Sequence, residues 1–98
     1  AAIPKALASH KALIYRHHAF AAVGETVAEA FFWAFQLNVA CEIQLKVLAT
    51  HKKVLLPKPE EAQRHHDAFF TDGWVANGSV EWPGLRRLLD TEGADYKE

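Results

Sequence analysis

The segment IYRHHAFAAVGETVAEAFFWAF, from Ile14 to Phe35, contains the signals that predict the fold. It starts in a short apolar run, passes through two adjacent histidines and a second apolar run, and ends in a cluster of aromatic residues. Thr26 to Glu29 matches the capping box, in which the threonine hydroxyl accepts from the amide three residues on and the glutamate reaches back to the threonine amide. The segment therefore predicts two short strands followed by a helix that begins after Thr26.

The predicted helix is long and apolar around much of its circumference. From Val27 to Leu48 the apolar residues recur at helical spacing and form a broad stripe with few polar residues between them. Such a helix needs cover on more than one side, from a sheet and from another helix or subunit. The aromatic residues near its start have helical spacing and fit a core or an interface better than a ligand cradle. They are Phe31, Phe32, Trp33 and Phe35.

Shorter elements flank this helix. The apolar run from Ala12 to Tyr15 predicts a strand covered on both faces, and Phe20 to Val23 predicts a second strand that ends at the Gly24 turn. Pro57 and Pro59 exclude a helix that continues through the segment after the long helix. The remaining predicted elements are a short helix from Pro4 to Ala8, a third helix from Glu60 that Asp72-Gly73 ends, a last helix near Pro83, and a polar tail over residues 91–98.

Composition limits the classes of function. The chain has 98 residues, 50% of them hydrophobic and 23% charged, which is the profile of one globular domain at most. A formal charge of -1 disfavours nucleic-acid binding. The longest apolar run, from Ala28 to Phe35, is broken by Glu29 and is far shorter than the ~20 residues of a membrane span, so no membrane association is expected. The single cysteine, Cys41, cannot form an internal disulfide, which favours the cytoplasm.

The histidines are the first candidates for chemistry. If the strand continued through His17 and His18, their side chains would point to opposite faces, so only one could ligate a given metal ion. His65 and His66 are neighbours on the third helix, about 100° apart around its axis. The sequence contains no H-x-H, H-E-x-x-H or C-x-x-C motif. On the residues alone a structural role outweighs a ligand role for these histidines, and the roles of His17, His65 and His66 stay open.

The stretch ALIYRHHAFAAVGETVAEAFFWAFQLNVACEIQLKVLA, residues 12–49, resembles the C-terminal half of the domain shared by class II aldolases and adducins. Val23 to Phe31 matches the family's V-G-x-[ST]-V-x-E-A-F turn and cap, and Ala40 to Gln44 matches its A-C-x-x-Q segment. Residues 79–98 are similar to the end of bacterial members. The resemblance implies that residues 1–98 are one partial domain, the C-terminal portion of a three-layer αβα fold with two short strands and about four helices.

The same resemblance implies a metal site and a reaction. His18 matches the family's third metal-binding histidine, which coordinates a divalent ion, usually zinc. The other ligands of the family, an H-x-H pair and an acidic residue, would lie upstream of Ala1. Tyr96 resembles a tail tyrosine that some members direct at a neighbouring subunit's active site. The implied activity is carbon–carbon cleavage of a small sugar phosphate or hydroxyketone by a metal-dependent lyase.

Two features weigh on that interpretation. The family's glycine after the metal-binding histidine is Ala19 here, and if that position needs a positive φ the alanine would cost on the order of 1 kcal/mol. A catalytically silent adducin-like domain, which assembles through the phenylalanine-rich helix and binds no metal, is the alternative hypothesis. Both hypotheses predict a homo-oligomer. An upstream H-x-H motif would favour the lyase.

Overall fold

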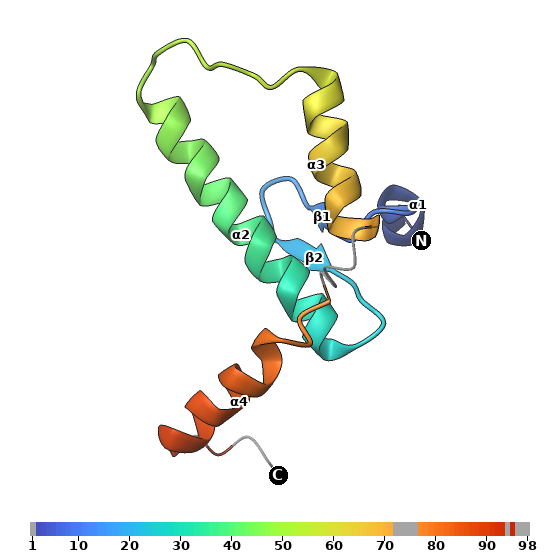
Figure 1. The fold of residues 1–98 in the computed structure, drawn as a ribbon, viewed down its shortest axis with the longest axis vertical. Helices are drawn as coiled ribbons and strands as arrows, with labels where there is room; N and C mark the ends of the chain where they lie inside the picture. The colour runs from blue at the N-terminus through green and yellow to red at the C-terminus, as the bar shows by residue number, and fades with distance from the viewer. Residues whose placement is uncertain (1, 72–76, 94, 96–98) are drawn as a thin grey trace.

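The computed structural model describes residues 2–71, 77–93 and 95, and within them the chain forms four helices and two strands. Figure 1 shows their arrangement: α2 lies beside a small hairpin, α3 runs down toward α1, and α4 extends from near the start of α2. The predicted fold class, mixed α/β with two short strands and four helices, is confirmed. The elements are α1 (Ala2–Leu7), β1 (Ala12–Ile14), β2 (Phe20–Ala22), α2 (Val27–Ala49), α3 (Pro59–Thr71) and α4 (Glu81–Thr91).

The two strands form an antiparallel hairpin. Leu13 pairs with Ala21 and Ile14 pairs with Phe20. Each strand ends one residue before its predicted end, β1 at Ile14 and β2 at Ala22. The prediction of a strand covered on both faces was wrong, since Ile14 is 59% exposed. One face of the hairpin packs against α2, while α1 contacts β1.

Helix α2 begins where the capping signal predicts. The Thr26 hydroxyl accepts a hydrogen bond of 3.1 Å from the Glu29 amide, which is the first half of the capping box. The second half differs from the prediction, because the Glu29 carboxylate accepts from the Glu25 amide, 2.8 Å away, instead of the Thr26 amide. The helix then runs for 23 residues to Ala49.

Aromatic contacts attach the last two helices to α2. The rings of Trp33 on α2 and Phe70 on α3 stack with centroids 5.7 Å apart and planes 13° apart. The ring of Phe31 lies 5.6 Å from that of Trp82 on α4. Residues 51–58, which join α2 to α3, have no regular secondary structure, in agreement with the prediction from the prolines.

Much of the apolar surface is open to solvent. The accessible surface is 8500 Å², whereas a compact monomer of 11.0 kDa exposes about 5,600 Å². The radius of gyration is 16.5 Å, against about 13 Å for a compact domain of this length. Among the described residues only Glu29, Phe32 and Gly78 are buried, and the side chains of Phe32 and Glu29 are 6% and 8% exposed. The fold is consistent with part of a larger class II aldolase-like domain.

No helix in the described part of the chain combines the length and the apolar content needed to cross a membrane.

Candidate functional site

The hairpin turn presents the two adjacent histidines. The Tyr15 amide donates to the Ala19 carbonyl at 2.7 Å and the His18 amide donates to the Tyr15 carbonyl at 3.3 Å, so the turn is closed by two backbone hydrogen bonds. His17 and His18 are both exposed. The chain leaves the strand conformation before it reaches them, so the expectation of alternating strand faces does not apply. Instead, the turn holds His18 at the surface.

The backbone strain of the turn lies at His17. Its φ of 59° is in the left-handed region that favours glycine, and histidine is one of the side chains that enter it more readily than most. Ala19 is not among the residues with positive φ in the described part of the chain. The free-energy cost that a positive φ would impose on Ala19, at the position of the family's glycine, is therefore absent here.

The described residues do not complete a metal site. They contain no cluster of three or more His, Cys, Asp or Glu side chains that could hold a metal ion. His18 supplies one exposed imidazole of the right chemistry for zinc, which takes three protein ligands in catalytic sites. Any further donors would have to come from elsewhere. Tyr96, the predicted catalytic tyrosine, lies outside the described residues.

Glu29 joins the hairpin to α2. One carboxylate oxygen, Oε1, lies 2.9 Å from Lys11 Nζ and accepts from Trp33 Nε1 at 3.3 Å. The other, Oε2, accepts from the Glu25 amide. The Glu25 amide and the Lys11 ammonium lower the pKa of Glu29 below its ordinary value of 4.5. The sequence pattern predicted a helix cap at Glu29 but not the ion pair, because Lys11 lies far away in the sequence.

The surroundings of Gly24 explain why the V-G-x-[ST] motif has a glycine at this position. A Cβ at this position would lie 2.6 Å from the Ala30 amide nitrogen and 2.6 Å from the Glu29 Cβ. The first is a backbone atom of α2, so the helix itself would have to move. The close approach of the turn to α2 therefore requires glycine here.

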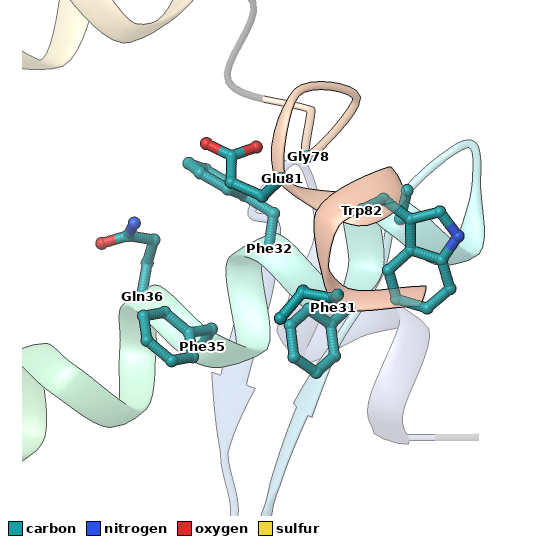
Figure 2. Close-up of a pocket in the computed structure, with 9 residues that line it drawn as sticks. Phe31, Phe32, Phe35, Gln36, Gly78, Glu81 and Trp82 are labelled. Carbon is teal, nitrogen blue, oxygen red and sulfur yellow. The ribbon is translucent and has the colours of Figure 1, made fainter. Parts of the chain in front are cut away.

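An apolar groove lies between α2 and the start of α4. Figure 2 shows Phe31 on α2 next to the segment that contains Gly78 and Trp82, with Phe35 further along the helix beside Gln36. The groove has a volume of about 160 Å³, with Gln36 and Glu81 as its polar members. Phe31 and Phe35 are 43% and 55% exposed. We call this feature the α2–α4 groove.

A second, larger cavity is lined by two histidines that are far apart in the sequence. His10, in the α1–β1 connection, and His66, on α3, line a cavity of about 540 Å³ together with Lys11 and Trp33. His66 Nδ1 lies 3.1 Å from Asp67 Oδ1, and this contact, with one from Gln63, lowers the pKa of Asp67. No sequence motif joins His10 to His66, so only the packing of α3 on α2 reveals the cavity.

Comparisons with known proteins agree with the hairpin, the cap and the long helix. Residues 1–45, which include α1, the hairpin and most of α2, match the sequence model of the class II aldolase and adducin N-terminal domain. Rat alpha-adducin is 52% identical over 94 residues, which cover 85% of this chain and 13% of that protein. The "Putative aldolase class 2 protein" of Caulobacter vibrioides is 34% identical over 92 residues, 94% of this chain and 36% of that protein. Rat gamma-adducin is 33% identical over 98 residues, 87% of this chain and 14% of that protein.

These features define a unit of one hairpin and one long helix. The buried Glu29 connects the turn before the helix to Lys11, next to the first strand. The chain belongs to the class II aldolase and adducin family. It spans 36% of the bacterial relative and between 9% and 14% of the adducins. No solved structure matches the chain.

Proposed function

We propose that this chain is part of a metal-dependent lyase of the class II aldolase type, in which His18 is one ligand of a divalent ion, with zinc as the expected metal. The substrate class is a small sugar phosphate or hydroxyketone, and the expected location is the cytoplasm. The supporting observation is the hairpin turn, which holds the imidazole at the family's metal-ligand position in an exposed place. The name of the Caulobacter relative is in line with this proposal.

The residues of the chain have distinct parts in this proposal. A bound metal ion would polarise the oxygen atoms of the substrate and stabilise the negative charge of an enediolate. His18 would help to hold that ion, and the Tyr15–Ala19 hydrogen bond fixes the turn from which its side chain extends. The Lys11–Glu29 ion pair ties the start of β1 to α2 and so limits movement of the hairpin. Tyr96 is proposed to reach the site of a neighbouring subunit.

Metal affinity tests the role of His18. His18→Ala in the complete lyase, with the proposed upstream ligands present, is expected to weaken zinc binding at least tenfold, as measured by equilibrium dialysis with metal analysis, because one of about three protein ligands is lost. The matched control is His17→Asn, which removes the adjacent imidazole but tolerates the positive φ at that position. Zinc binding that both variants retain at the parent's affinity would refute the metal role of His18.

A second candidate function is adducin-like assembly without catalysis. It is favoured by the exposed aromatic residues of the α2–α4 groove. It is also favoured by the large accessible surface area. The excess of this area over that of a compact monomer is greater than the area of about 800 Å² that each partner buries in a standard interface. Several of the related proteins are adducins. In this proposal the phenylalanine-rich helix packs copies of the chain together. The lyase proposal also requires a homo-oligomer, so assembly by itself does not separate the two.

Sedimentation equilibrium tests assembly through the α2–α4 groove. Phe35→Ser is expected to weaken self-association of the full chain at least tenfold, because a buried phenylalanine at an interface contributes about 1.5–3 kcal/mol. Val27→Ser is the matched control, since Val27 is also exposed on α2 but does not line the groove. If Phe35→Ser and Val27→Ser self-associate with equal affinity, the interface does not include the groove. Loss of association with zinc binding retained would show that the groove acts apart from the metal ligand.

A further inference from the structure

The large cavity between the start of β1, α2 and α3 lies apart from the hairpin turn. Lys11 and Ala12 contribute to it at the start of β1, whereas His17 and His18 follow the end of that strand. Its volume of about 540 Å³ is within the range of small-molecule sites, about 300–1,000 Å³. The cavity is therefore large enough for an organic ligand and is separate from the residue proposed to bind metal.

The charged and ionisable groups of the lining are all basic. Lys11, His10 and His66 line the cavity, and no aspartate or glutamate of the described segments does so. Lys11 contacts Glu29 through one ammonium group that has three donor hydrogens, so further donors stay available to a ligand. Glu29 is less accessible than its partner, with 11% of its side chain exposed against 36% for Lys11. The accessible part of the ion pair is therefore the cation.

Three aromatic residues, Trp33, Phe69 and Phe70, contribute to the remaining wall of the cavity. Phe70 stacks on Trp33 and its ring centroid lies 4.8 Å from that of His66, so three rings form a connected surface. Phe69 also lines the cavity. His66 Nδ1 contacts Asp67, which leaves the other ring nitrogen, Nε2, as the atom available to a ligand. Aromatic rings favour stacked or edge-on contact with a second planar ring.

We propose that this cavity binds a small aromatic carboxylate, with the carboxylate held by Lys11, His10 and His66 and the ring packed against Phe69 and Phe70. The Lys11 ammonium is a charged donor, and hydrogen bonds from charged donors to a carboxylate are stronger than neutral ones, which gives the cavity a preference for the anion over a neutral analogue. This inference does not depend on the proposed lyase activity, because His18 takes no part in the cavity.

Titration with naphthalene-2-carboxylate tests the proposal. Binding to the ¹⁵N-labelled full chain is followed by NMR at the Lys11 and Ala12 amides and at the Trp33 indole N–H. We expect a Kd of about 1 mM or tighter, the range of a weakly bound fragment, and at least tenfold weaker binding of naphthalene-2-carboxamide. Equal affinity for the acid and the amide would overturn the proposal, as would saturation without shifts at these three positions.

Substitutions separate the basic lining from unspecific binding. His10→Gln combined with His66→Gln is expected to weaken binding of the carboxylate at least tenfold, and both positions are exposed, so the fold is retained. His65→Gln is the control, because His65 is next to His66 on α3 but does not line the cavity. Its affinity is expected to stay within twofold of the parent. An equal effect of the control and of the double variant would contradict the assigned site. Lys11 is kept, since its loss would also break the contact with Glu29.

Discussion

Replacing Gly78 with alanine is expected to lower the free energy of unfolding by about 3 kcal/mol, through backbone strain and overpacking together. Gly78 has a φ of 73°, and a Cβ there would lie 2.3 Å from the Ala28 carbonyl oxygen. That oxygen belongs to the backbone of α2, so it cannot rotate away. The segment before α4 would have to separate from α2, and the contact between Phe31 and Trp82 would be lost.

Two other glycines serve as controls for Gly78. Gly93 has a φ of 70° but open space around it, so Gly93→Ala reports the cost of φ alone, about 1 kcal/mol. Gly84 lies within α4, and a Cβ added there would meet only the end of the Arg87 side chain, at 3.8 Å. Gly84→Ala is therefore expected to stabilise by about 0.5–1 kcal/mol. Urea denaturation of the full chain measures all three. If Gly78→Ala lowers the free energy of unfolding no more than Gly93→Ala does, the assigned close approach of Gly78 to the α2 backbone is wrong.

Replacing Glu29 with glutamine is expected to lower the free energy of unfolding at pH 7 by about 2–3 kcal/mol. The variant loses the negative charge that pairs with Lys11 and weakens the acceptor of the Glu25 amide. Glutamine has almost the same shape, so the loss reports charge and hydrogen bonding more than volume. The control is Glu42→Gln, which removes an exposed ion pair with Lys46 and should change the free energy by about 0.5 kcal/mol or less.

The pH dependence of stability gives a second test of the role of Glu29. Its pKa is lowered in the folded chain, so folding favours the ionised form. That contribution is present above the unfolded pKa, near 4.5, and is lost as pH falls through the lower folded pKa. The parent should therefore lose stability below about pH 4.5 more steeply than Glu29→Gln. Parallel curves for the two proteins in acid would contradict the assigned ion pair.

Local sequence signals were sufficient to predict most of the fold. Thr26 and Glu29 located the start of α2, because a capping box involves atoms only a few residues apart. Pro57 and Pro59 separated α2 from α3, because proline restricts the backbone wherever it occurs. The two strands were also predicted close to their observed positions. Their pairing as an antiparallel hairpin was not, since a pair of histidines is not a recognised turn signal.

The candidate sites were predicted less completely. His18 was identified through the family motif, and its role as a metal ligand stays a prediction, as does that of Tyr96. The Lys11–Glu29 ion pair and the cavity between His10 and His66 depend on residues far apart in the sequence. Their detection requires the packing of β1 and α3 against α2, which no pattern in the sequence specifies.

The sequence by itself determined the family, the order of the elements and the start of α2, because these follow from short-range hydrogen bonding, periodicity and motif. Only the tertiary structure decided where strain and burial occur. It placed the positive φ at His17 rather than at Ala19, because the geometry of the turn sets φ. It also buried the charged Glu29 and left Phe35 exposed, because burial depends on which surfaces meet and not on the hydrophobicity of one residue.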